Sequence, residues 1–250
     1  MLLEVKDLNI SLTSEKSVAE HISFRLGQGE MLSIVGSSGA GKTTICKAIM
    51  GLLGNTYRAD GEILFQGEDL LDLPERKRQT IYGKEICLIM QNPMTAFNPS
   101  IRVGRQMEKT YLLHHGKTPR QEMQRLFAAI LQKLGLEDTQ RILNSYPFTL
   151  SGGMLQRLMI AAALMCQPAL LVADEATTAI DACNRIGLMR ELKSFCKDGM
   201  SVLFVTHDLR SASVSDRILV MDRGQIVEQG KTEQILNTPK EAVSYTHLRA

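Results

Sequence analysis

One stretch of the sequence limits the fold more than any other. A glycine-rich loop separates an apolar run at residues 31–35 from a helical pattern at residues 43–53. The order of strand, glycine loop and helix is the context in which Gly-x-x-x-x-Gly-Lys-Thr binds the phosphates of a nucleotide. It predicts an α/β fold with buried, parallel strands. The loop, with the threonine that follows it, consists of Gly36, Ser37, Ser38, Gly39, Ala40, Gly41, Lys42, Thr43 and Thr44.

The residue types of this loop indicate how it would act. Its glycines let successive backbone N–H groups turn toward the β and γ phosphates, and Lys42 reaches the oxygens of the same phosphates. Thr43 offers a hydroxyl group to Mg²⁺. The helix that begins near Thr43 directs the positive end of its dipole at the bound anion. We therefore expect a nucleotide with Mg²⁺.

Three further apolar runs extend this pattern. They lie at residues 84–90, 169–173 and 202–205 and alternate with helical segments, which predicts a largely parallel sheet covered on both faces. The second run ends in Asp174 and Glu175, at the strand edge where open α/β sheets bind ligands. We expect Asp174 to hold Mg²⁺ through water and Glu175 to polarise the attacking water.

The remaining segments predict smaller units. Residues 103–143 show apolar positions at helical spacing, which indicates a helical insertion. The charged cluster at residues 75–78 favours a solvated turn over a basic patch. We also expect strands at residues 3–10, 22–26 and 62–65, a helix at residues 155–166, and a hairpin from residues 218–220 and 225–228.

The composition excludes several classes of function. The 29 basic and 27 acidic residues leave a net charge of +2, and the sequence lacks the dense basic run that nucleic-acid binding requires. Its five cysteines are scattered, which argues against a disulfide framework or a zinc site and favours a reducing compartment. No apolar stretch approaches the roughly 18 residues of a membrane span. We expect the chain in the cytosol, or held at a membrane by a partner.

The segment Leu150-Ser151-Gly152-Gly153 adds a second, more specific signal. Together with the glycine loop and the Asp174-Glu175 pair, it resembles the ATP-binding subunit of an ABC transporter, over almost the whole chain. The resemblance implies an α/β P-loop NTPase of ABC type. Its central sheet would be mostly parallel, with an N-terminal antiparallel β subdomain and an inserted α-helical subdomain. The implied parts are a nucleotide-binding core at residues 1–92 and 168–235, a helical subdomain at residues 93–167 and a tail at residues 236–250.

The resemblance also implies roles that spacing alone does not give. Gln91 would contact the metal and the water and link the site to a membrane subunit, while His207 would sense the γ phosphate. Asp181 would lie near the seam of a dimer. The implied catalytic set is Lys42, Gln91, Glu175 and His207, and the implied residues at the γ phosphate of a partner's nucleotide are Ser151, Gly152 and Gly153.

Three positions depart from the pattern of the family. Ala176 replaces the proline that usually follows the catalytic glutamate, and Met154 replaces the usual glutamine after Ser-Gly-Gly. No aromatic residue occupies the segment around Leu12, where many members stack the adenine. Neither Ala176 nor Met154 removes a charge or a ligand, so the implied catalysis stands, whereas we expect adenine recognition to be weaker or supplied by other residues.

The implied function is an ATPase that closes as a dimer around two ATP molecules with Mg²⁺ and drives a membrane channel. Its partners would be a second ABC ATPase subunit, two membrane permease subunits and, indirectly, an extracytoplasmic substrate-binding protein, but no nucleic acid. A heterodimer is favoured and a homodimer stays open. The chain would lie on the cytoplasmic face of the bacterial inner membrane as a peripheral subunit.

Two segments resemble one branch of the family, the oligopeptide and nickel importers. They lie at residues 91–99 and 145–157, and the second is closest to nickel importers. Nickel or a metal chelate is therefore the first expectation for the cargo, and a dipeptide or oligopeptide is the alternative. A soluble ABC ATPase that acts on nucleic acid or ribosomes is a remote alternative, and a scaffold without turnover is disfavoured because the catalytic set is complete.

Overall fold

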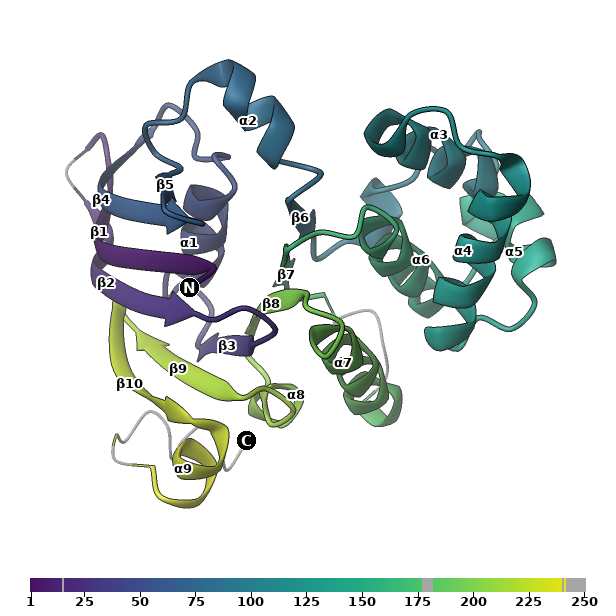
Figure 1. Ribbon diagram of the computed structural model, residues 1–250. Coiled ribbons are helices and arrows are strands. Elements are labelled where there is room, and N and C mark those ends of the chain that lie inside the picture. The colour runs from purple at the N-terminus through teal and green to yellow at the C-terminus, as the bar shows by residue number, and fades with distance from the viewer. Residues whose placement is uncertain (15, 177–181, 240, 242–250) are drawn as a thin grey trace.

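The computed structural model describes residues 1–14, 16–176, 182–239 and 241 (Figure 1). Among these residues, a six-stranded sheet with the order β10-β9-β3-β8-β7-β6 forms the centre of the molecule. Its neighbouring strands are parallel except for β9 and β10, which confirms the mostly parallel sheet. The strands are β3 (Met31–Gly36), β6 (Ile86–Ile89), β7 (Leu170–Asp174), β8 (Ser201–Thr206), β9 (Arg217–Asp222) and β10 (Gln225–Lys231).

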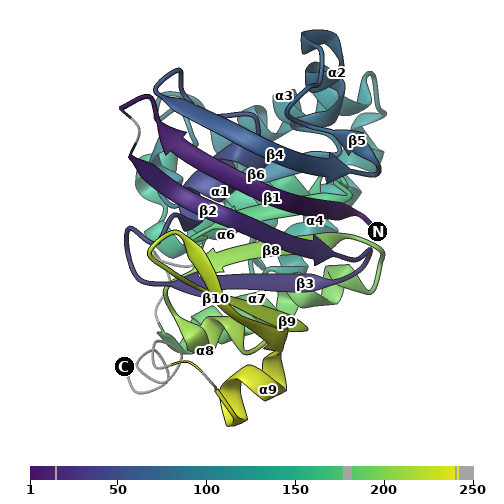
Figure 2. The same ribbon diagram turned by 90° about the vertical axis from the view of Figure 1, so that its left-hand side faces the viewer.

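A second sheet is antiparallel and comes mainly from the N-terminal part of the chain. Its order is β2-β1-β4-β5, and Figure 2 shows β2, β1 and β4 crossing the view side by side. The expected N-terminal β subdomain is thereby confirmed. The strands are β1 (Leu3–Leu12), β2 (Ser17–Leu26), β4 (Tyr57–Phe65) and β5 (Glu68–Asp69).

Helices cover the central sheet and form the insertion on one side of it (Figure 1). The insertion contains α3 (Val103–His115), α4 (Arg120–Lys133), α5 (Thr139–Asn144) and α6 (Gly152–Leu164). No helix in the described part of the chain is long and apolar enough to cross a membrane. The other helical segments are α1 (Lys42–Ile49), α2 (Glu75–Ile81), η1 (Pro93–Thr95), η2 (Pro147–Thr149), α7 (Ala182–Cys196), α8 (Leu209–Ala212) and α9 (Thr232–Asn237).

The central strands are buried on both faces and divide two hydrophobic cores. Successive side chains of a strand point to opposite faces, so neighbouring residues of β7 enter different cores. Leu170 and Val172 pack with α1 and the antiparallel sheet. Leu171 and Ala173 pack with the apolar faces of the helical insertion. The insertion therefore shares one core with the sheet and is anchored to it.

Two local expectations are wrong. The helix after the glycine loop ends at Ile49 rather than at residue 53, because Met50 caps it and Gly51 follows with a φ of +63°. The charged cluster at residues 75–78 is not a turn. It lies in α2, whose first turn is closed by hydrogen bonds from the Lys77 and Arg78 backbone N–H groups to the Pro74 carbonyl oxygen. No residue of α2 is fully buried; most of its side chains are exposed, and Ile81 packs against the core beside the antiparallel sheet.

Candidate nucleotide site

The glycine loop connects β3 to α1 at the edge where the parallel strands end. Its glycines are required by close backbone contacts. A Cβ atom on Gly36 would lie 2.4 Å from the Met221 carbonyl oxygen. Gly41 has a φ of +95°, and a Cβ atom there would lie 2.8 Å from the Val18 carbonyl oxygen. The loop can therefore follow this path only with glycine at both positions.

Lys42 begins α1 and lies inside the loop, with 5% of its surface exposed. Its Nζ donates hydrogen bonds of 2.8 Å to the carbonyl oxygens of Gly36 and Ser37. Burial lowers the pKa of Lys42, while the carboxylates of Glu175 and Asp174 act in the opposite direction. The amine thus lies at the helix N-terminus, which favours a bound anion.

Asp174 is the last residue of β7 and lies against the start of α1. The Thr43 hydroxyl donates a hydrogen bond of 3.2 Å to the Asp174 carboxylate. Burial raises the pKa of Asp174, an effect that the Thr43 hydrogen bond opposes. A hydroxyl and a carboxylate at this distance are oxygen donors of the kind that Mg²⁺ prefers, and Mg²⁺ usually keeps several waters beside one or two protein ligands. The residues present therefore fit Mg²⁺.

Glu175 follows β7 and has a φ of +49°, a backbone region that side chains rarely adopt. Its backbone N–H donates to the Val205 carbonyl oxygen of β8 at 2.9 Å, which fixes this turn. The side chain lies between two partners from neighbouring strand ends. The Gln91 amide nitrogen donates to Glu175 Oε2 at 2.8 Å, and His207 Nδ1 lies 3.1 Å from Glu175 Oε1. Strained backbone of this kind is concentrated at functional sites.

Four strand ends thus bring the expected residues together. The loop with Lys42 and Thr43 follows β3, Gln91 follows β6, the two carboxylates end β7, and His207 follows β8. The carboxyl ends of parallel strands share one edge of a sheet, which is why residues far apart in sequence meet here. The structure places Gln91, Glu175 and His207 in one hydrogen-bonded cluster, a contact that the sequence spacing did not reveal.

The Ser-Gly-Gly segment lies apart from this cluster. Ser151 caps the N-terminus of α6, where its hydroxyl oxygen accepts a hydrogen bond of 3.2 Å from the Met154 backbone N–H. Gly152 and Gly153 form the first turn of the helix, and Ser151 and Gly152 are exposed. In Figure 1, α1 and α6 lie on opposite sides of β6 and β7. Asp181 lies outside the described residues.

One residue of the same segment was missed by the sequence reasoning. Gln156, on α6, is completely buried. Within the described part of the chain, neither its amide nitrogen nor its amide oxygen has a hydrogen-bond partner. The sequence signal was that Gln156 lies among apolar residues on a helix that is hydrophobic on several faces. Because glutamine is rarely fully buried, this signal did not lead to a prediction of burial.

Comparisons with known proteins agree with this geometry. Residues 19–178 match the family model for ABC transporters. The chain is 40% identical over 242 residues to the metal-staphylopine import system ATP-binding protein CntD of Staphylococcus aureus, covering 96% of this chain and 89% of that protein. It is 41% identical over 246 residues to the oligopeptide transport ATP-binding protein OppD of Bacillus subtilis, covering 96% and 68% of the two chains.

A solved structure shows the same fold. The ATP-binding cassette MJ0796, described as a dimer in a post-hydrolysis state bound to ADP and Pi, superimposes with a TM-score of 0.81. It is 27% identical, and the match covers 92% of this chain and 99% of that one. From the family model, the relatives and this superposition, it follows that the chain belongs to the ABC transporter family and is an ATP-binding cassette that hydrolyses ATP with Mg²⁺.

Proposed function

We propose that this chain is the ATP-hydrolysing subunit of a membrane importer. The observation that carries the proposal is the cluster of Gln91, Glu175 and His207 beside the Lys42 loop and Asp174. A carboxylate held from both sides is suited to orient and polarise a water molecule. A buried lysine at a helix N-terminus is suited to bind phosphate oxygens. ATP hydrolysis needs both functions close together.

Each residue of the site has a part in the proposed mechanism. Lys42 exchanges its bonds to the loop carbonyl groups for bonds to the phosphate oxygens, and the loop N–H groups bind the same oxygens. Thr43 and Asp174 hold Mg²⁺, with Gln91 nearby, and the metal, when bound, supplies charge neutralisation at the phosphates. Glu175 orients the water toward the γ phosphate. Gln91 and His207 keep the Glu175 carboxylate in place, and His207 also contacts the γ phosphate.

The exposed start of α6 supports a dimer in which each active site is shared. Ser151, Gly152 and Gly153 present a helix N-terminus to solvent, apart from the Lys42 loop of the same chain. In the proposal they bind the γ phosphate held by a second cassette, and Asp181 lies near the seam. We favour a heterodimer of two different ATPases. Residues 93–167 act as the helical unit, residues 1–92 and 168–235 as the core, and residues 236–250 as a tail.

The names of the relatives support a proposal for the cargo and the membrane partners. One relative at 40% identity is named for metal-staphylopine import and another at 41% for oligopeptide transport. We propose nickel or a metal chelate as the cargo, with a dipeptide or oligopeptide as the alternative. The chain works with two permeases and, through them, with an extracytoplasmic substrate-binding protein. It lies at the cytoplasmic face of the inner membrane and binds no nucleic acid.

Three experiments test the proposal. Purified with its permeases, the wild-type chain should release phosphate from ATP, and Lys42→Ala should abolish this release; normal ATPase activity of the variant would overturn the catalytic assignment. Retention of the tagged chain on nucleic acid rather than on permeases would overturn the transport role.

In cells that lack the chain, loss of radioactive nickel uptake without loss of labelled dipeptide uptake supports the metal cargo, and the reverse result supports the peptide alternative.

A further inference from the structure

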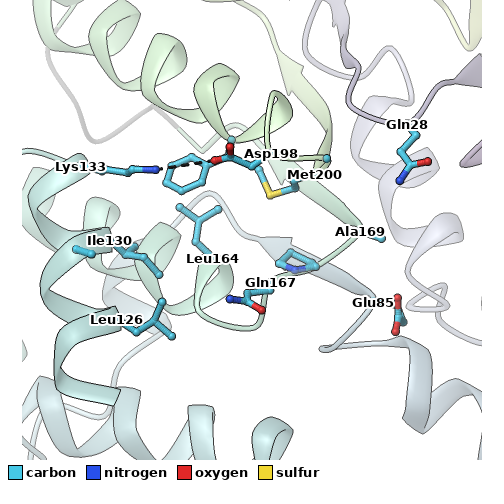
Figure 3. A pocket seen from close by; sticks show the side chains of 14 residues that line it. Gln28, Glu85, Leu126, Ile130, Lys133, Leu164, Gln167, Ala169, Asp198 and Met200 are labelled. Atoms are coloured by element: carbon cyan, nitrogen blue, oxygen red, sulfur yellow. Dashed lines mark ion pairs between the residues drawn. The ribbon is translucent and has the colours of Figure 1, made fainter. Parts of the chain in front are cut away.

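A cavity of about 630 Å³ (Figure 3) lies at the edge where the central strands begin, and the nucleotide site lies at the edge where they end. Its walls come from residues just before β3, β6, β7 and β8, such as Gln28 and Glu85, and from α4, α6 and the end of α7. The glycine loop and the carboxylates lie at the other ends of these strands. A ligand in this cavity would therefore not compete with ATP for the same residues.

The middle of the cavity is apolar. Leu126 and Ile130 come from α4, Leu164 ends α6, and Met200 precedes β8. In Figure 3 the side chains of Leu164 and Met200 lie between the two polar ends of the cavity. The volume falls within the roughly 300–1,000 Å³ that is usual for small-molecule sites, which are also mostly apolar with a few polar groups.

One polar end is already neutralised. Lys133 Nζ lies 3.9 Å from an Asp198 carboxylate oxygen and 4.8 Å from the centre of the Phe195 ring. The ammonium group thus has both a carboxylate and an aromatic face as partners. This end has no net charge to offer to a ligand.

The opposite end carries a free negative charge. Figure 3 places Glu85 and Gln28 there, away from Lys133, with Gln167 between the two ends. Among the described residues, the Glu85 side chain has no hydrogen-bond or ion-pair partner, and the amide groups of Gln28 and Gln167 also have none. The Glu85 carboxylate is therefore the charged acceptor at this end that has no partner among the described residues, and the three charged side chains of the cavity lining sum to one negative charge.

We infer that this cavity binds a small molecule with an apolar body and a primary ammonium group. A primary ammonium carries three N–H donors and one positive charge, which matches the Glu85 carboxylate. The apolar body packs against the leucine, isoleucine and methionine side chains of the middle. A neutral or anionic head group would leave the Glu85 charge without a partner.

The test compares two probes that differ only in the head group, the charged 4-phenylbutylamine and the neutral 4-phenylbutan-1-ol, by calorimetry on the full chain with Mg²⁺ and excess ADP. We expect the amine to bind at least about tenfold more tightly than the alcohol, the usual effect of a charged hydrogen bond. Equal affinities, or no binding of the amine at millimolar concentration, would overturn the inference. A higher affinity of the amine when ADP is left out would also overturn it, because competition with ADP would place the amine at the nucleotide loop.

Two variants locate the site. Glu85→Gln should weaken the amine about tenfold and leave the alcohol unchanged, whereas Glu122→Gln, an exposed change on α4 outside the cavity lining, should alter neither. Ala129→Trp places a large ring in the cavity from the exposed face of α4 and should reduce binding of the amine by at least about tenfold. Retained ADP binding shows that each variant is folded. Unchanged amine binding in either cavity variant contradicts the assignment.

Discussion

The Gln91 amide donates a hydrogen bond of 2.8 Å to the Glu175 carboxylate, although 84 positions separate the two residues. The bond joins the end of β6 to the end of β7. Gln91 also lies two residues past the end of β6, on the segment that leads into the helical insertion through η1. A movement of the insertion that displaces Gln91 would therefore change the position of the Glu175 carboxylate.

The first prediction concerns this carboxylate. Glu175→Gln should lower the kcat of ATP hydrolysis by about 100-fold or more, because the amide cannot polarise the attacking water. ATP binding should be retained, since the phosphate contacts of Lys42 and the loop are unchanged. Gln91→Ala should reduce kcat less, because it removes only a group that positions Glu175. Phosphate release and equilibrium binding of a fluorescent ATP analogue measure the two effects. Loss of binding in Glu175→Gln would contradict this assignment.

The second prediction concerns pH and the buried Asp174. Burial raises the pKa of this carboxyl group, so its ionised form is less favourable in the folded chain than in the unfolded chain. Below the ordinary pKa the group is neutral in both states and costs nothing. As the pH rises through the raised pKa of the folded state, stability is lost, and the full loss is present at neutral pH.

Asp174→Asn should therefore raise the melting temperature of the nucleotide-free protein at pH 7 and reduce the stabilisation by Mg²⁺ and ATP. Differential scanning calorimetry with and without the ligands measures both effects. Asp60→Asn serves as a control, because Asp60 is exposed and lies outside the site. A lower melting temperature of the nucleotide-free Asp174→Asn protein would show that the carboxylate stabilises the fold.

The third prediction compares two helical glycines. A Cβ atom on Gly104 in α3 would lie 2.7 Å from the Leu143 carbonyl oxygen, whereas a Cβ atom on Gly187 in α7 would meet nothing within 4 Å. Gly104→Ala should lower the free energy of unfolding by about 1–3 kcal/mol through the steric conflict. Gly187→Ala should raise it by about 0.5–1 kcal/mol, because alanine favours the helix. Urea denaturation of both variants tests the pair, and effects of equal sign would refute the argument.

The fourth prediction concerns the buried Gln156. Met has a similar size and no amide group, so Gln156→Met should raise the free energy of unfolding by about 1–3 kcal/mol. The matched control is Gln106→Met, because the Gln106 amide forms three hydrogen bonds, with the Asn98 N–H and with the carbonyl oxygens of Asn98 and Ile101. This control should be destabilised. If Gln156→Met is destabilised to the same degree, the Gln156 amide has a partner in the folded protein.

The sequence was sufficient to predict those parts of the site that are formed by residues close together along the chain. The glycine loop and the apolar runs before Asp174 and His207 predicted strand ends, because an apolar run that stops at glycine or at polar residues marks the end of a buried strand. The sequence was insufficient to predict contacts between residues that are far apart along the chain. The contacts of Glu175 with Gln91 and His207 depend on strand order in the sheet, and this order is set by long-range pairing that no spacing encodes.

Local errors had local causes. The sequence did not predict α2, because a short run of charged residues is compatible with a turn and with a solvated helix. The hydrogen bonds to the Pro74 carbonyl oxygen show that the segment is a helix. The cavity around Glu85 combines residues from distant parts of the chain, so no motif marks it. Gln156 was not recognised because a single polar residue in a helix normally faces solvent.

The hydrogen bonds of Lys42 to the carbonyl groups of Gly36 and Ser37 have a consequence for the speed of nucleotide exchange. The chain itself supplies the contacts that keep the loop curved, so the phosphates meet a receptor that is already shaped. When a nucleotide binds, phosphate oxygens replace the two carbonyl oxygens around the Lys42 ammonium group, and little additional backbone has to be ordered. Departure of the product reverses the exchange without melting the loop. A cassette of this kind can bind the next ATP after product release while the phosphate-binding loop keeps its shape.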